Sequence, residues 1–172
     1  SAYHASPWLF LEDTEGWMSP QADQVLPEAY HGVLYAQGTK PIILLSTPGQ
    51  TIKVDKTLQA QIRMQVTAGD TAYLWLPRNS EENVPDFQHF TDASLQTAIA
   101  NLIPLTLNKT ADFHVYTVNI GEILLTETVS TATISQIGLL FPQVELAQTR
   151  HILIDYINVS SLNTDAASWT QY

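Results

Sequence analysis

Two aromatic side chains at alternate positions of one predicted strand are the residues best placed to do chemistry. Tyr73 and Trp75 stand two positions apart, so both rings face the same side of that strand. Flat rings stack on the apolar CH faces of sugars, while planar polar side chains bond the hydroxyls. Gln61 and Arg63 offer such planar groups on the preceding predicted strand. We therefore predict a carbohydrate-binding cleft made of these four residues; the alternative is that the two rings belong to the core.

The strand that carries Gln61 and Arg63 shows the clearest alternation in the chain. Apolar and polar residues alternate from 58 to 67, which predicts a strand with one buried face. A turn at 68–70 and a second strand at 71–77 follow, so we expect the two strands to form a hairpin. Further strands are expected at residues 8–12, 32–36, 41–45, 113–120, 135–141 and 152–159. The continuous apolar runs within 41–45 and 152–159 are typical of strands buried on both faces.

One segment departs from the period of two. Leu95, Ala98, Ile99 and Leu102 follow helical spacing and precede Pro104, so residues 91–102 are predicted to form a short helix. The expected fold class is all-β: a jelly-roll β-sandwich of two antiparallel sheets with one short helix in a connection. We expect a single domain over residues 1–172, with its core over about 8–162 and a tail at 163–172.

Charge and composition exclude several partners. Seven Lys and Arg residues face seventeen Asp and Glu residues, which gives a net charge of −10. Nucleic-acid binding needs a basic surface that neutralises phosphates, and no such excess exists. The absence of cysteine excludes disulfides and zinc–thiolate sites. Only 14% of the residues are charged, so we expect an exported protein that is extracellular, periplasmic or in the cell envelope.

The common signatures of enzymes are absent from the sequence. Neither Gly-x-Ser-x-Gly, His-Glu-x-x-His, a phosphate loop nor the dinucleotide glycine fingerprint occurs. A carboxylate pair for glycoside hydrolysis needs only proximity in space, and the sequence singles out no such pair. We therefore expect a non-catalytic protein, with an enzyme on the same scaffold as an alternative.

Three separated segments share their order and spacing with one known family. They are residues 10–17 (FLEDTEGW), 113–120 (FHVYTVNI) and 152–159 (ILIDYINV), with 134–139 (ISQIGL) before the last. Together they resemble the opening, middle and closing strands of galactose-binding-like jelly-roll carbohydrate-binding modules. The resemblance implies a module that recognises a neutral poly- or oligosaccharide on a sandwich face. It also implies a neighbouring catalytic or membrane-anchored domain outside this chain.

The same resemblance implies a structural calcium ion. The first and last strands of that family often hold one, and the matching positions here are Glu12 and Asp155. Calcium prefers several oxygen ligands, and a carboxylate flanked by apolar residues, as Asp155 is, needs a cation or hydrogen bonds. The alternative is that both carboxylates accept hydrogen bonds at the sheet end. The alternative function is a structural or protein-interaction sandwich of an exported or envelope protein that does not bind sugar.

Overall fold

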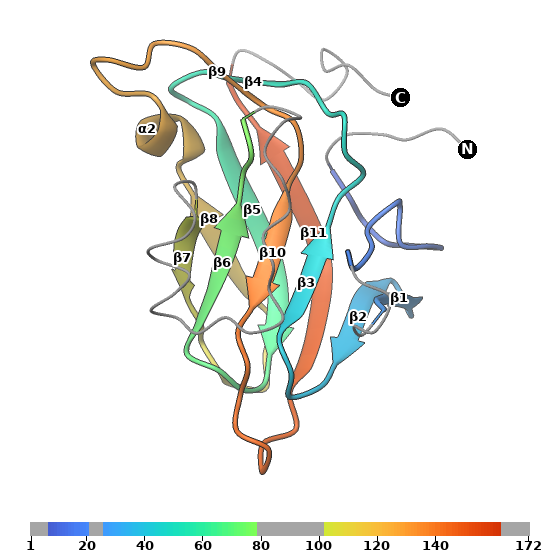
Figure 1. Cartoon of the computed structure of the whole chain (residues 1–172). Helices are drawn as coiled ribbons and strands as arrows, with labels where there is room; N and C mark the ends of the chain where they lie inside the picture. The colour runs from blue at the N-terminus through green and yellow to red at the C-terminus, as the bar shows by residue number, and fades with distance from the viewer. Residues whose placement is uncertain (1–6, 21–25, 79–101, 163–172) are drawn as a thin grey trace.

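The computed structural model describes residues 7–20, 26–78 and 102–162. Within them, the two larger of three antiparallel sheets lie one in front of the other around a shared core (Figure 1). One short helix, α2 (Ile120–Leu124), interrupts the described strands. The predicted fold class, an all-β sandwich of antiparallel sheets with a short helix, is confirmed. No helix among these residues is both long and apolar enough to cross a bilayer.

The first sheet has five strands in the order β1-β2-β11-β5-β8. They are β1 (Glu28–Tyr30), β2 (Val33–Gln37), β11 (His151–Ser160), β5 (Gln59–Val66) and β8 (His114–Val118). The long strands β11 and β5 lie side by side, and their register shifts between Ile154 and Tyr156. Alternation along β5 matches the prediction, since Ala60, Ile62 and Met64 are buried while the residues between them are half exposed.

The second sheet has four strands in the order β3-β10-β6-β7. They are β3 (Ile42–Leu45), β10 (Gly138–Phe141), β6 (Thr71–Trp75) and β7 (Leu102–Thr106), while β4 (Ile52–Val54) pairs with β9 (Ala132–Ile134). Strands β5 and β6 therefore belong to different sheets. The predicted hairpin is wrong, because the turn between these strands carries the chain from one layer to the other.

The two sheets differ in how their outward sides are covered. Every residue of β3 and β10 is buried, so the apolar run at 41–45 is covered on both faces, as predicted. The inward residues of both sheets share one large core. The outward residues of the four-stranded sheet form a second buried apolar cluster of Ile43, Leu45, Tyr73, Trp75 and Leu140. Strand β11 is instead buried on one side only.

The opening segment is a turn rather than the strand predicted at 8–12. Trp8 forms a single antiparallel bridge with Ile157. The backbone then turns, and Phe10 has a φ of 54°. The carboxylate of Glu15 accepts hydrogen bonds from the backbone N–H groups of Leu9 and Phe10, both at 2.8 Å. These bonds replace strand pairing, because they satisfy the same backbone donors locally.

Two further boundaries differ from the predictions. The strand predicted at 113–120 ends at Val118, and α2 begins at Ile120. A side chain at Gly121 would collide with the backbone of Asp55, so glycine allows the chain to turn close to the residues before β5. The strand predicted at 135–141 begins only at Gly138. The helix predicted at 91–102 lies outside the described residues except for Leu102, which begins β7; the predicted tail at 163–172 lies wholly outside them.

Candidate functional site

The outward side of the five-stranded sheet is polar and half exposed along its two longest strands. Gln61, Arg63 and Gln65 point outward from β5, and Asn158 and Tyr156 of β11 stand opposite Gln61 and Arg63. We call the outward residues of β2, β11 and β5 the polar face. Its members are Tyr35, Gln37, Gln59, Gln61, Arg63, Gln65, His151, Leu153, Asp155, Tyr156, Asn158 and Ser160. This face presents amides, rings and one guanidinium in two adjacent rows.

Arg63 is held on the polar face from two sides. Its Nη1 donates to Asp155 Oδ2 at 2.6 Å, and its guanidinium lies 4.7 Å from the centre of the Phe113 ring. Both charged side chains are more than one-third exposed, at 39% and 37%, so water and salt weaken the pair and its stabilising effect is below about 1 kcal/mol. Its larger effects are to orient the planar guanidinium and to cancel its charge.

Aromatic rings lie at the β1–β2 end of this sheet. Tyr30 is 58% exposed, and its ring centre lies 6.3 Å from that of Tyr35. The Tyr35 hydroxyl donates to Gln37 Oε1 at 2.9 Å and lies 2.8 Å from His151 Nδ1. These contacts fix the orientation of the Tyr35 ring, which stands beside the outward residues of β11.

A hollow continues the polar face at its other end. It has a volume of about 240 Å³ and is lined by Thr57, Gln59, Ser160, Ser161 and Leu162. Gln59, the first residue of β5, pairs with Ser160, the last residue of β11. Uncharged groups therefore line a depression where the two central strands end.

The structure separates the four residues predicted to form a sugar cleft. Gln61 and Arg63 lie on the polar face, whereas Tyr73 and Trp75 lie on the outward side of the other sheet, across the core. These two rings are 3% and 1% exposed, so they belong to an apolar cluster, as the alternative states. The single cleft is not formed, because it required β5 and β6 to share one sheet.

Sequence reasoning missed the aromatic members of the polar site. Tyr35 and Tyr156 are half exposed and stand on β2 and β11 beside the predicted Arg63 row. A signal for Tyr35 was present, because it alternates with the apolar Leu34 and Ala36. Tyr156 could not be placed in this way, since the register shift beside Asp155 breaks the alternation.

Glu12 and Asp155, the two carboxylates matched to a calcium site, have different surroundings. Asp155 is bonded to Arg63, as the hydrogen-bonded alternative expects, and a guanidinium occupies the place of a cation at Oδ2. Glu12 is exposed in the opening turn, where Asp13 Oδ1 accepts the backbone N–H of Glu15. Among the described residues, no three His, Cys, Asp or Glu side chains group as metal ligands. The Glu12–Asp155 pair therefore does not fit a calcium site in this arrangement.

Comparison with known proteins supports the class of fold. No family model matches the chain, and no curated protein matches it. Eleven chains of solved structures match. A structure named BiXyn10A CBM1, in its apo form, has a TM-score of 0.55 and 8% identity, and the match covers 92% of this chain and 98% of that one.

Two other matches are parts of much longer proteins. The glycoside hydrolase domain of Endo-D from Streptococcus pneumoniae R6 has a TM-score of 0.54 and 10% identity over 87% of this chain. A sialidase has a TM-score of 0.51 and 10% identity over 97% of this chain. The chain spans only 22% of the Endo-D structure and 19% of the sialidase. These likenesses define a β fold that occurs in carbohydrate-related proteins.

Proposed function

We propose that this chain is a non-catalytic, galactose-binding-like carbohydrate-binding module that binds a neutral poly- or oligosaccharide on its polar face. One observation carries the proposal: half-exposed amides, an oriented guanidinium and aromatic rings share one side of the five-stranded sheet. On the other sheet, Tyr73 and Trp75 are buried. The polar face is therefore the sandwich face that offers planar polar groups together with rings.

The chemistry of the polar face suits uncharged hydroxyls. The amides of Gln61 and Gln65 can both donate and accept hydrogen bonds, and Arg63 adds donors in a fixed plane. The rings of Tyr35 and Tyr156 supply apolar surface with a polar edge. Because Asp155 balances Arg63 and the chain carries a net charge of −10, an acidic polymer would be repelled.

The fold comparisons support this proposal at the level of architecture. One match spans nearly the whole of a structure named as CBM1, which supports an independent module. The other two occupy parts of a glycoside hydrolase domain and a sialidase. We accordingly propose that the module acts beside a catalytic or membrane-anchored domain outside this chain, in an extracellular, periplasmic or envelope location.

Affinity electrophoresis tests the proposed function. Native gels would contain xylan, glucomannan, galactan or mixed-linkage glucan, and at least one of these neutral polymers should retard the protein. The double variant Gln61→Ala/Tyr156→Ala should lose most of that retardation, because it removes one amide and one ring from adjacent strands. Gln143→Ala, which removes an exposed amide in the connection between β10 and β11, outside the polar face, is the matched control. Retardation by none of the polymers would contradict the proposal, as would equal retardation of the double variant.

A protein-interaction domain is the second candidate function. The opening segment exposes Leu9, Leu11 and Met18 at 42%, 72% and 56%, and exposed apolar side chains can contact another protein where they form one patch. This candidate predicts that Leu11→Ser/Met18→Ser changes complex formation while leaving polysaccharide retardation unchanged.

A further inference from the structure

The edge strands of the two large sheets differ in whether a further strand can pair with them. An unpaired edge carries a row of free N–H and C=O groups, to which a strand of another chain can bond. The edges are β1 and β8 in the five-stranded sheet, and β3 and β7 in the four-stranded sheet. Short length, charged side chains, proline and a covering segment are the usual protections of such edges.

Three of these edges carry one of those protections. Strand β1 has three residues, follows Pro27 and begins with the exposed Glu28. In β3, the Leu45 N–H donates to the Met18 carbonyl at 2.8 Å, and the Leu45 carbonyl accepts the Met18 N–H at 2.9 Å. Pro104 stands at the centre of β7, where it has no N–H to donate to another strand. Pairing at these edges is therefore short or blocked.

Strand β8 lacks these protections. Its five residues read His-Val-Tyr-Thr-Val, with no proline, acidic residue, lysine or arginine, and they favour extended structure. Within the described part of the chain, β5 is the strand that pairs with β8, along one of its edges. Val115 is 50% exposed, and Thr117 is also exposed. The other edge of β8 is therefore open to a further strand.

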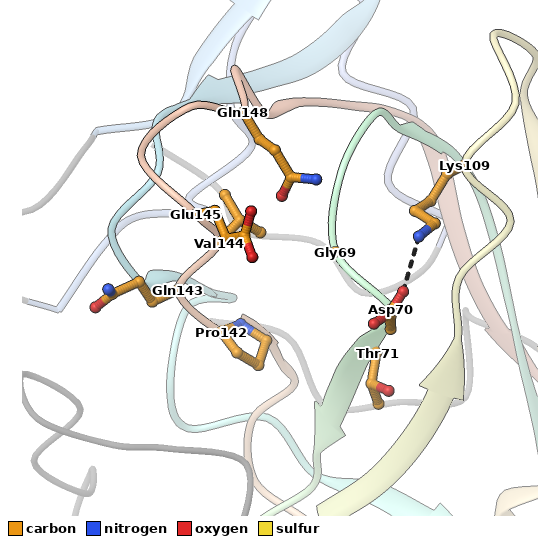
Figure 2. A pocket seen from close by; sticks show the side chains of 9 residues that line it. All are labelled: Gly69, Asp70, Thr71, Lys109, Pro142, Gln143, Val144, Glu145 and Gln148. Carbon is orange, nitrogen blue, oxygen red and sulfur yellow. Dashed lines mark hydrogen bonds and ion pairs between the residues drawn. The ribbon is translucent and has the colours of Figure 1, made fainter.

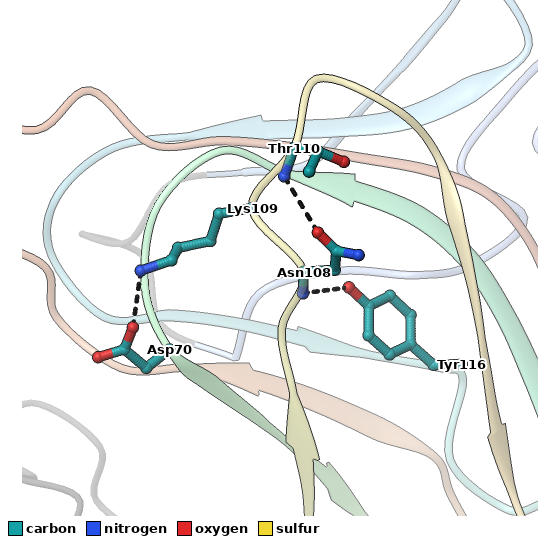
Figure 3. Close-up of polar contacts among 5 residues, drawn as sticks. All are labelled: Asp70, Asn108, Lys109, Thr110 and Tyr116. Atoms are coloured by element: carbon teal, nitrogen blue, oxygen red, sulfur yellow. Dashed lines mark hydrogen bonds and ion pairs between the residues drawn. The ribbon is translucent and has the colours of Figure 1, made fainter.

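The connection that leads into β8 is held against the end of the sandwich. The Asn108 N–H donates to the Tyr116 hydroxyl at 2.9 Å, and Asn108 Oδ1 accepts the Thr110 N–H at 3.4 Å (Figure 3). Lys109 Nζ donates to Asp70 Oδ1 at 2.8 Å, and both residues line a pocket of about 250 Å³ at that end (Figure 2). Because these bonds already order the start of β8, pairing with a further strand costs less entropy.

The positions of the β8 side chains suit pairing with a second copy of the same strand. Val115 and Thr117 stand opposite Arg63 and Gln61, on the outward side of the sheet. Opposite residues of an antiparallel pair point to the same side, so a two-fold axis between two β8 strands must pass beside one residue. An axis at Tyr116 pairs all five residues, with Val115 of each copy opposite Thr117 of the other. Such pairs of β-branched side chains pack well and bring no like charges together.

We propose that two copies of this chain form a dimer by antiparallel pairing of β8 with β8, which joins their five-stranded sheets into one continuous sheet. A two-fold contact closes on itself, and the other edges are protected, so association stops at two copies. Five strand residues span about 17 Å, which is too short to bury the roughly 800 Å² per partner of a standard interface. The dimer is therefore weak, with a Kd of about 10 μM to 1 mM.

The two-fold axis has a consequence for the polar face. Because it stands perpendicular to the joined sheet, the polar faces of both copies lie on the same side. Two linked sites can bind one polymer more tightly than either site does alone. This consequence rests on the proposed function, whereas the dimer itself does not.

Sedimentation equilibrium of the full chain, without polysaccharide, tests the dimer. The mean mass should rise from that of one chain toward that of two as the protein concentration increases to about 1 mM. Higher ionic strength should strengthen the dimer, because each copy has a net charge of −10 and salt screens their repulsion. A mass that stays at one chain over the whole range would overturn the proposal, and so would species larger than a dimer.

Lysine substitutions locate the interface. Val115→Lys and Thr117→Lys each place two like charges near the two-fold axis, so both variants should stay monomeric over the same concentration range. Leu146→Lys is the matched control, because it adds the same charge at a residue that is 86% exposed in the β10–β11 connection, and it should dimerise like wild type. Equal dimerisation of all three variants would contradict pairing through β8.

Introduced cysteines test the register. The chain contains no cysteine, so a disulfide can form only between introduced residues. Opposite Cα atoms of antiparallel strands lie about 4.5–5.5 Å apart, which a disulfide can span. Under mild oxidation, Val115→Cys/Thr117→Cys should form a covalent dimer, and Leu146→Cys should form little. A yield no greater than that of Leu146→Cys would overturn the proposed pairing.

Discussion

Arg63 is the residue on which the chemistry of the polar face depends most. It stands between Asp155 and the Phe113 ring, so its planar group is presented at a fixed angle although it is partly exposed. A half-exposed pair of this kind adds little stability, but an oriented guanidinium loses less freedom when it bonds a ligand. If the proposed function holds, this arrangement therefore contributes more to binding than to folding.

Asp55 provides a test of pH-dependent stability at a single residue. Its Oδ1 accepts the Thr57 hydroxyl at 2.7 Å and the Thr57 N–H at 2.8 Å. The Thr57 hydroxyl bond, the largest cause, lowers the pKa of Asp55 from 3.8. A depressed pKa means that the stabilisation is present above the unfolded-state pKa and is lost as pH falls through the folded-state pKa. Asp55→Asn should therefore lower Tm at pH 7, and the difference from wild type should shrink at more acidic pH.

Thermal unfolding at a series of pH values checks this expectation. Asp112→Asn is the matched control, because Asp112 is an exposed aspartate between β7 and β8. If the Tm difference between Asp55→Asn and wild type stayed constant into strong acid, the lower Tm would not come from loss of the ionised carboxylate.

At the scale of elements, the close packing of β3, β10 and β6 depends on one glycine. A Cβ on Gly138 would lie 2.8 Å from Leu45 Cδ2 and 2.9 Å from Trp75 Cε3, both closer than ordinary packing allows. Gly138→Ala should therefore destabilise the protein by about 1–3 kcal/mol, as overpacking usually does. Chemical denaturation measures the change in the free energy of unfolding.

A second substitution separates crowding from other effects of alanine at position 138. Leu45→Ala opens space beside Gly138, so the double variant should be less destabilised than the sum of the two single variants. If the losses in the free energy of unfolding were additive, contact with Leu45 would not be the cause of the destabilisation by Gly138→Ala.

The elements also show what the sequence could and could not predict. Alternation at 58–67 and the apolar run at 41–45 predicted β5 and β3, because burial on one or both faces has a direct sequence pattern. Strand pairing has no such sequence pattern. The turn between β5 and β6 crosses from one sheet to the other, so Trp75 lies on the opposite side of the sandwich from Gln61. Three-residue strands such as β4 and β9 are too short for a period to be recognised.

At the scale of the whole molecule, calcium binding can be tested through its effect on Tm. A metal that binds only the folded state raises Tm with its concentration. The family resemblance predicts such an effect at Glu12 and Asp155, whereas the Arg63–Asp155 bond argues against it. From the ion pair we expect the same Tm in excess calcium and in excess EDTA. A Tm that calcium raises and EDTA restores would contradict this and reinstate the calcium site.

The two large sheets differ in the exposure of their outward sides. Rings and amides are accessible on the five-stranded side, while the strands β3 and β10 are buried on both of theirs. If sugar chains bind only the polar face, every module on a fibre or a flat lattice of such chains would have the same orientation. Each buried indole, such as that of Trp75, would then have the same orientation in every bound module, and a layer of bound modules would absorb polarised ultraviolet light anisotropically.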